Sequence, residues 1–422
     1  MVPRQRRQHD VSGPALAIAP AGNVRGYRTD TSFDGERRLP DGALVLVEGG
    51  KILAVEPRSA AAPADCEVSY LPGTTLLPGL IDTHVHLCGD NSPRALDQFF
   101  QLSPEDLERI IAEGLQQPLA AGVTAVRDLG DFQWAVVDRR RAAGNGSARP
   151  VEPTVAASGP PITIENGHCW SMGGAASGPA ELRRAVRDRA ERGADVVKIM
   201  SSGGVLTPGT DVMACQFSMA DLRLVVDEAH AVGLAVTAHA HGLPAVEQCV
   251  SVEVDGIEHC TCLTPNGIDA PPALAERLAT AGTLVCPTLG IAPGVEPGPQ
   301  IKALLERTGL TMQHRLDLVR TLYAAGVTLV SGSDAGISPG KPHGVLPEAV
   351  IELVAAGVPA EVALTSATSL AAKACGIADR TGRLRAGLDA DLLIVDGDPL
   401  REITALRDVR VVVSRGRETA EL

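Results

Sequence analysis

Short apolar runs alternate with amphipathic stretches across residues 79–379, and this alternation restricts the fold more than any other feature of the chain. The runs have the length of buried strands, whereas stretches such as SPEDLERIIAEGLQQPLAAG, which opens with a helix-capping Ser103, have helical spacing. The strand candidates lie at 80–86, 123–128, 152–158, 195–200, 234–239, 255–259, 283–287 and 327–333. Eight strand–helix repeats predict an α/β fold, a (β/α)8 TIM barrel.

Both ends of the chain have a different pattern. Residues 13–78 contain short apolar runs such as ALVLVEG and KILAVEP, divided by Gly, Pro and Asp, and residues 380–422 contain DLLIVDGDPL and DVRVVVSRGRE. This pattern is typical of β-structure. We therefore expect one small β-sandwich domain built from both segments, with residues 1–12 as a disordered tail.

Composition restricts the partners and the compartment. The formal net charge of −13 argues against nucleic acid, which selects basic surfaces. No apolar run reaches the roughly 18 residues of a membrane span. The nine cysteines are odd in number and lack the spacing of a disulfide framework, which favours the cytoplasm. Cys260 and Cys262 beside His259 are compatible with a thiolate metal site, although small buried side chains are the favoured interpretation.

Six residues with metal-binding side chains follow the predicted strands in a fixed order. They are His84 and His86 in PGLIDTHVHL, Lys198 in ADVVKIMSSGG, His239 in AVTAHAHG, His259 in DGIEHC and Asp334 in VSGSDAG. Each lies at or near the C-terminal end of an apolar run, which is the end of a barrel strand where catalytic groups gather. The sequence therefore predicts one site for two divalent metal ions.

Lys198 is the most specific of these signals. Strand alternation places Val196, Lys198 and Met200 on one face, so a lysine would enter the barrel interior. A cationic ammonium would be repelled by two dications, whereas a neutral amine can take up CO2 and become an anionic carbamate. The alternative is a lysine paired with a carboxylate or with substrate.

These motifs, in this order, resemble the binuclear, carboxylated-lysine branch of the amidohydrolase superfamily. Within it, VVKIMSSGG, TAVRDLG and AHAHG resemble the group of Xaa-Pro dipeptidases, arginine carboxypeptidases and ochratoxin-hydrolysing amidases. The resemblance implies that His239 and His259 bind the second of two metal ions, with zinc favoured, and that the Lys198 carbamate bridges both. It also implies that Asp334 binds one metal and handles the proton of the bridging water.

Further residues are expected to contact the substrate or to line its path into the site. His168 in ENGHCW would polarise the carbonyl or orient substrate, and His241 would face substrate unless it exchanges roles with His239. Arg127 is a carboxylate partner or a structural ion pair, Ser202 and Gly203 would offer backbone N–H groups, and His343 would line the entrance. ENGHCW departs from the Gly-Gly-His-Gly pattern of the resembled group, since Glu165 and Cys169 replace small residues.

The resemblance implies hydrolysis of an amide C–N bond in a dipeptide, an N-acyl amino acid or a related small amide, by a metal-bridging hydroxide. Hydrolysis of a cyclic amide, lactone or ester by the same metals is the alternative, and deamination is less favoured. A non-catalytic scaffold is disfavoured because all six ligand positions are filled. A homo-oligomer is compatible with such a barrel, although the sequence identifies no interface.

Overall fold

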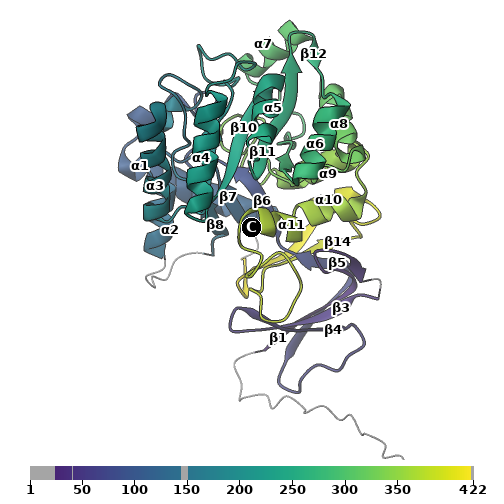
Figure 1. The fold of residues 1–422 in the computed structure, drawn as a ribbon. Coiled ribbons are helices and arrows are strands. Elements are labelled where there is room, and N and C mark those ends of the chain that lie inside the picture. The colour runs from purple at the N-terminus through teal and green to yellow at the C-terminus, as the bar shows by residue number, and fades with distance from the viewer. Residues whose placement is uncertain (1–23, 40, 144–150, 420–422) are drawn as a thin grey trace, which may run out of the picture.

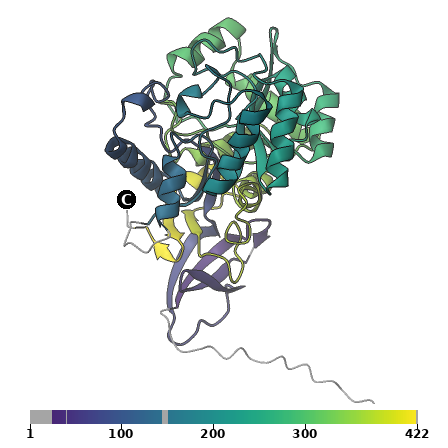
Figure 2. The ribbon, with the colours of Figure 1, turned by 60° about the vertical axis from the view of Figure 1, so that its left-hand side comes forward.

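The computed structural model describes residues 24–39, 41–143 and 151–419, so the predicted tail at 1–12 lies outside the described residues. A helix-rich region carries a smaller sheet region at one end (Figure 1), and the turned view in Figure 2 shows the same division. The predicted α/β class is confirmed by the mixture of parallel strands and helices.

Strands from both ends of the chain hydrogen-bond into one sheet with the order β16-β15-β14-β5-β1-β3-β4, and β2 pairs with β1. Its strands are β1 (Arg25–Phe33), β2 (Arg38–Leu39), β3 (Ala43–Glu48), β4 (Lys51–Pro57), β5 (Glu67–Pro78), β14 (Leu392–Asp396), β15 (Val409–Ser414) and β16 (Arg417–Glu418). The two chain ends meet where β14 pairs antiparallel with β5, with Leu392 opposite Pro78. Tyr27, Val45 and Ile394 belong to a separate apolar cluster on this sheet.

Seven of the predicted strands in the middle of the chain are present. They form β6 (Leu80–Val85), β7 (Val123–Asp128), β8 (Thr154–Ala157), β9 (Val196–Met200), β10 (Ala235–Gly242), β11 (Gly256–Thr264) and β13 (Leu284–Cys286). One parallel sheet contains β6, β7 and β8, and the other contains β9, β10, β11 and β13 with the short antiparallel β12 (Gly267–Ile268). The assigned sheets are therefore two, and they do not constitute one closed barrel.

The eighth predicted strand, 327–333, is not assigned as a strand. It forms an isolated parallel bridge from Leu329 to Val285 of β13, and the Ser331 carbonyl accepts a 3.1 Å hydrogen bond from the Thr83 N–H in β6. The segment thus contacts both sheets, but it forms only this single bridge to β13 and no continuous strand pairing. A second bridge joins Ile162, which follows β8, to Ile199 of β9.

Helices follow the parallel strands and cover them. They are α1 (Pro104–Ala120), α2 (Ala135–Ala143), α3 (Gly178–Arg192), α4 (Met219–Ala231), α5 (Leu243–Ser251), α6 (Pro272–Ala281), α7 (Pro299–Thr308), α8 (Met312–Ala324), α9 (Leu346–Ala355), α10 (Ala360–Ser366) and α11 (Ser369–Ala374), with 3-10 turns at Phe99–Gln101, Trp170–Met172 and Ile403–Arg407. The predicted cap is confirmed, since Ser103 Oγ accepts the Asp106 N–H at 3.1 Å.

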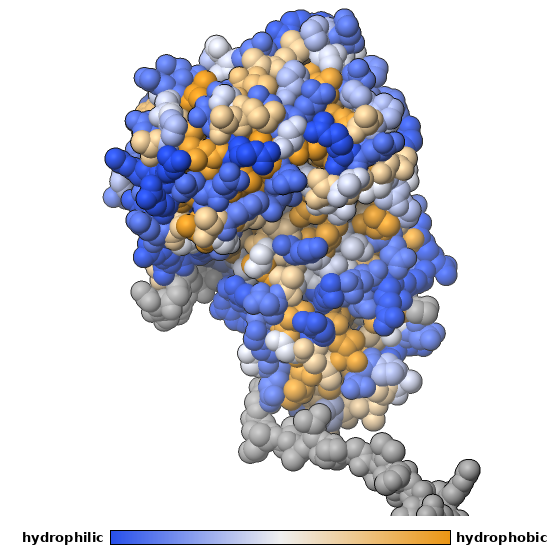
Figure 3. Space-filling view, viewed as in Figure 1, coloured by the Kyte–Doolittle hydropathy of each residue, from blue (hydrophilic) through white to orange (hydrophobic). Residues whose placement is uncertain are grey.

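The main core lies between the helices and the parallel strands, and aliphatic side chains dominate it. Hydrophilic residues cover much of the face in Figure 3, with apolar patches on both regions. Among the described helices, none has the length and apolar character that crossing a bilayer requires.

Candidate active site

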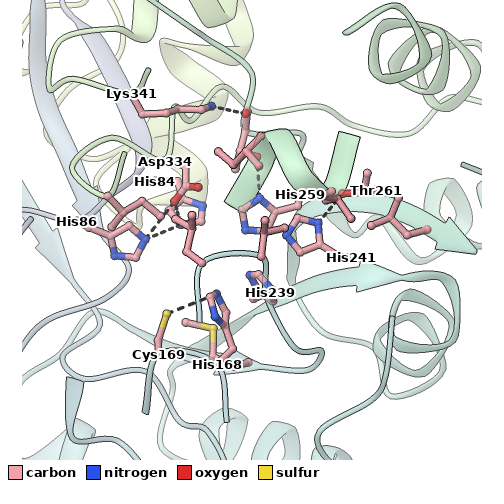
Figure 4. A pocket seen from close by; sticks show the side chains of 18 of the residues that line it. His84, His86, His168, Cys169, His239, His241, His259, Thr261, Asp334 and Lys341 are labelled. Carbon is pink, nitrogen blue, oxygen red and sulfur yellow. Dashed lines mark hydrogen bonds and ion pairs between the residues drawn. The ribbon is translucent and has the colours of Figure 1, made fainter. Parts of the chain in front are cut away.

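The six predicted metal-binding side chains line one cavity of about 160 Å³. His84, Lys198, His239 and His259 lie in β6, β9, β10 and β11. His86 and Asp334 lie in the loops after β6 and after the Leu329 bridge. Figure 4 shows the imidazoles and the Asp334 carboxylate directed toward the same space. The parallel strands bring these groups together because their carboxyl ends point the same way.

His84, His86 and Asp334 form the first group of possible ligands. Asp334 Oδ1 lies 3.3 Å from His84 Nε2 and 3.2 Å from His86 Nε2, and the two Nε2 atoms are 3.3 Å apart. Burial opposes ionisation of Asp334, but the neighbouring His84 and His86 hold its carboxyl pKa below the usual range. Two imidazoles and an ionised carboxylate at this spacing can hold one divalent cation.

The second group consists of His239, His241 and His259, whose ring nitrogens include one set within 4.8 Å of one another. His239 Nε2 donates to the Gly203 carbonyl at 3.1 Å. The Thr288 hydroxyl donates its proton to the Pro287 carbonyl. It therefore accepts from His259 Nδ1, at 2.8 Å. The lone pairs of His239 and His259 are therefore on Nδ1 and Nε2, respectively, free for a ligand.

The first group shows the same arrangement. His84 Nδ1 donates to Glu258 Oε2 at 2.8 Å, and His86 Nδ1 approaches the Gly130 carbonyl at 3.4 Å. All four predicted histidine ligands thus have one nitrogen engaged by an oxygen acceptor and the other available, which is typical of metal-binding histidines. His241 Nδ1 is 2.7 Å from Thr261 Oγ1, which leaves its Nε2 without a contact to that hydroxyl. The exchange of roles between His241 and His239 stays a prediction.

Lys198 is completely buried, and its Nζ has no hydrogen-bond partner among the described residues. Burial lowers the pKa of the Lys198 amine, while the charges of Glu258 and Asp334 oppose this shift. An unpaired buried ammonium is strongly destabilising, whereas a neutral amine is not. Burial therefore shifts Lys198 toward its neutral amine form.

Backbone strain accompanies two of these residues. His259 has φ of 67° and Asp334 has φ of 62°, in the left-handed region that non-glycine residues rarely adopt. Such conformations cost about 1–3 kcal/mol and cluster at functional sites. Both side chains line the cavity, His259 from within β11 and Asp334 from the loop after the Leu329 bridge.

Arg127 does not line the cavity. Its Nη2 donates to Glu258 Oε1 at 3.1 Å, its Nε to the Thr83 carbonyl at 2.8 Å and its Nη1 to the Ala374 carbonyl at 2.9 Å. Of the two interpretations of Arg127, the structural ion pair is the one that this geometry supports. Glu258, which the sequence analysis missed, connects Arg127 to His84 and also accepts from Thr237 Oγ1 at 2.6 Å.

Ser202 and Gly203 offer no free N–H group to substrate, contrary to expectation. The Ser202 N–H donates to the His239 carbonyl at 3.3 Å, and the Gly203 N–H donates to the Ala214 carbonyl at 3.2 Å. Ser202 Oγ instead accepts the His241 N–H at 3.0 Å. The loop therefore positions His239 and His241, because its polar groups are used within the protein.

His168 lines the cavity, with its ring centroid 4.5 Å from that of His239. Its Nδ1 is 2.8 Å from Thr207 Oγ1, and its Nε2 is 3.4 Å from the Cys169 thiol. Burial lowers the pKa of His168 to about 3, which keeps the ring neutral at physiological pH. A neutral imidazole here can hydrogen-bond to a substrate without adding positive charge.

His343 is not at the entrance. It is buried outside the cavity, and its Nε2 lies 3.3 Å from the Gly89 carbonyl. Gly114 of α1 packs so closely that an added Cβ would lie 3.1 Å from the His343 ring. The histidine is a buried residue that packs against α1.

This burial predicts a pH effect on stability. Burial lowers the pKa of His343 to about 4, whereas the unfolded value is about 6.5. The stabilising difference is therefore present above about pH 6.5 and is lost as pH falls toward 4. Urea unfolding of the metal-free proteins is the measurement. Relative to His343→Gln, the free energy of unfolding of the wild-type protein should fall by up to about 3 kcal/mol between about pH 7.5 and about pH 4.5. A constant difference across this range would contradict the assignment.

Two cationic side chains that the sequence analysis missed also line the cavity, Arg315 of α8 and Lys341. Lys341 Nζ donates to the carbonyls of Thr288, Ser333 and Leu289 at 2.7, 2.8 and 3.2 Å. Arg315 Nη2 donates to the carbonyls of Pro287 and Thr288 at 2.7 and 3.2 Å. No motif indicated either residue, because both lie in loop or helix segments without a distinctive pattern.

Three known proteins are similar to this chain over most of its length. The ochratoxinase of Aspergillus niger is 27% identical over 417 residues, which covers 90% of this chain and 82% of that protein. A solved Xaa-Pro dipeptidase with methionine in its active site has a TM-score of 0.80 at 26% identity, covering 94% of this chain and 99% of its own. A prolidase solved with N-methylphosphonate-L-proline has a TM-score of 0.77 at 27% identity, with the same coverage.

The family model described as the Amidohydrolase family matches residues 75–419, which include all six predicted metal-binding residues. This match confirms the resemblance that the motifs indicated. The chain therefore belongs to the amidohydrolase family and is a hydrolytic enzyme.

Proposed function

We propose that the protein hydrolyses an amide C–N bond of a small substrate with two divalent metal ions, preferably zinc. The observation that carries this proposal is the convergence of four imidazoles, the Asp334 carboxylate and the unpartnered Lys198 amine on one cavity. Nitrogen and carboxylate ligands suit zinc, and a carbamate on Lys198 would supply a further anionic oxygen ligand.

The donor set fits the two ions. His84, His86 and Asp334 would hold one, His239 and His259 the other, and carboxylated Lys198 would contact both. Carboxylation joins the neutral Lys198 nitrogen to the carbon of CO2 and releases one proton. The product is an anion on a nitrogen that has no hydrogen-bond partner among the described residues. Divalent ions held by these residues would polarise the scissile carbonyl and would lower the pKa of a bound water.

The chain's own residues account for the proton transfers. Asp334 is ionised because neighbouring histidines lower its carboxyl pKa, so it accepts the proton of the attacking water. It then returns that proton to the leaving nitrogen. Neutral His168 donates a hydrogen bond to the carbonyl oxygen as negative charge develops there.

We also propose that the two parallel sheets are parts of one (β/α)8 barrel formed by residues 79–379. The bridges at Ile162 and Leu329 support this, because each joins a connecting segment to a parallel strand. The sheet from both chain ends would belong to a separate small sandwich domain, whose described residues are 24–39, 41–78 and 380–419. A cytoplasmic location is proposed with it, since all nine cysteines are free.

The substrate class that we favour is a dipeptide, an N-acyl amino acid or a related small amide. The names of two relatives, ochratoxinase and Xaa-Pro dipeptidase, support it, as does the methionine in the active site of the latter. Hydrolysis of a cyclic amide, lactone or ester is the alternative, because the same carbonyl chemistry serves all of them.

Removal of metal tests the proposal. Protein stripped with a chelator should lose hydrolysis of a panel of dipeptides and N-acyl amino acids, followed by mass spectrometry. Zinc together with bicarbonate should restore it better than zinc alone, because Lys198 needs CO2 to become an anion. Undiminished hydrolysis in the metal-free protein would contradict the proposal, and cleavage confined to lactones, esters or cyclic amides would favour the alternative.

A further inference from the structure

Part of the cavity lining is apolar and comes from segments other than the strands that carry the histidines. Ile301, Leu304 and Leu305 of α7 line it, together with Leu310 between α7 and α8. These side chains form an apolar wall. An apolar surface beside metal-binding groups stabilises a substrate that carries an apolar group, because it removes that group from water.

Arg315 lies in the same cavity and differs from the other cation there. The three protons of Lys341 Nζ are matched by three carbonyl acceptors. Arg315 uses only Nη2, on two carbonyls, and its Nε and Nη1 have no hydrogen bond to any residue in the described ranges. Arg315 forms no ion pair within the described residues, although the charges of Glu352 and Asp334 act on its guanidinium. A partly buried guanidinium with unused donors is a site for a carboxylate.

The contacts of Arg315 also fix its position relative to the ligands. Thr288 accepts from Arg315 through its carbonyl oxygen and from His259 through its hydroxyl, so one residue holds both side chains. The guanidinium is therefore anchored next to the second group of histidines. Arg315 lines the cavity, and its Nε and Nη1 are the donors that these contacts leave unused.

We propose that Arg315 is the specificity residue that binds the free carboxylate of the substrate, while the apolar wall receives its side chain. The substrate class is then an amide whose amine side is an apolar amino acid with an unblocked carboxylate. This inference rests on the proposed amide hydrolysis and adds what the pocket selects. The role of carboxylate partner, considered for Arg127, belongs to Arg315. The donors of Arg127 are used by Glu258 and two backbone carbonyls, outside the cavity.

The cavity volume restricts the size of the substrate. A cavity of about 160 Å³ is close to the roughly 150 Å³ of an apolar cavity that accepts benzene. Because the metal ions and the scissile amide would share this volume, only a compact side chain can enter it. We therefore expect compact N-acyl derivatives of leucine to be better substrates than those of tryptophan.

The test compares zinc-loaded wild-type protein with Arg315→Met on N-acetyl-L-leucine and N-acetyl-L-leucinamide, which differ in the carboxylate. A charge-assisted hydrogen-bond pair lost without replacement corresponds to a factor on the order of 100. Wild-type kcat/KM should favour the free acid by about this factor, and Arg315→Met should abolish the preference. Arg315→Lys should retain part of it, because the charge remains. Arg320→Met, on the exposed side of α8, is the matched control and should keep the wild-type preference.

The outcomes separate this proposal from the general one. An equal preference in wild-type protein and Arg315→Met, at equal zinc content, would overturn the role of Arg315. If wild-type protein cleaves neither substrate, the proposed function fails for N-acyl amino acids, and calorimetric binding of L-leucine decides the role of Arg315. Weaker binding to Arg315→Met by on the order of 100-fold would support it, and equal binding would overturn it.

Discussion

Replacement of Lys198 by alanine is expected to lower kcat/KM by about 10³-fold or more, which corresponds to about 4 kcal/mol of transition-state stabilisation. The physical reason is that the variant loses the side chain that would place an anion among the metal-binding groups. Without it, fewer than two ions should remain bound. Metal content by elemental analysis and amide hydrolysis by mass spectrometry are the measurements.

Two further variants control this result. Lys198→Met keeps most of the buried volume, so a loss shared with Lys198→Ala reflects the missing amine and not a cavity. Lys373→Ala, at an exposed position on α11, should retain wild-type activity and metal content. A short carboxylate such as propionate should partly restore Lys198→Ala by replacing the carbamate. Two bound ions and full activity in Lys198→Ala would reject the carbamate.

Replacement of Asp334 by asparagine is expected to lower kcat by about 10³-fold or more, because the variant loses both a charged ligand and the base that accepts the water proton. Asparagine is the informative substitution here. Asp334 has φ of 62°, and asparagine tolerates this left-handed conformation, whereas alanine would add backbone strain. The fold should therefore be retained.

The measurement is kcat for the free-acid amide together with the unfolding midpoint. Asp227→Asn, at an exposed position on α4, removes one carboxylate elsewhere and should leave kcat unchanged. A wild-type kcat in Asp334→Asn would exclude Asp334 as the base. A large fall in the unfolding midpoint would instead assign the loss to misfolding.

Local patterns predicted much of the architecture. Strand alternation and helical spacing are properties of neighbouring residues, so seven strands and the Ser103 cap could be located in the sequence. The eighth predicted strand shows the limit. Residues 327–333 have a strand-like composition, but whether they form a ladder depends on β13 and β6, which lie far away in the chain.

The surroundings of the site were less predictable. Arg127 and Arg315 are chemically equivalent in the sequence, and only their partners distinguish them. Glu258 engages Arg127, whereas Arg315 reaches the cavity from α8 with donors unused. His343 appeared to follow a strand toward the entrance, yet α1 packs over it. Each of these outcomes depends on which distant segment covers the residue.

By itself, the sequence determined that ligand-type side chains would follow successive buried strands, because strand ends and side-chain chemistry are encoded in consecutive residues. Tertiary structure alone decided which nitrogen of each histidine is free, which cation has unused donors and which wall is apolar. These properties arise from hydrogen-bond partners and packing contributed by segments far apart in the chain, such as Gly203 for His239 and Thr288 for His259. A pattern of neighbouring residues contains no information on those partners until the fold brings them together.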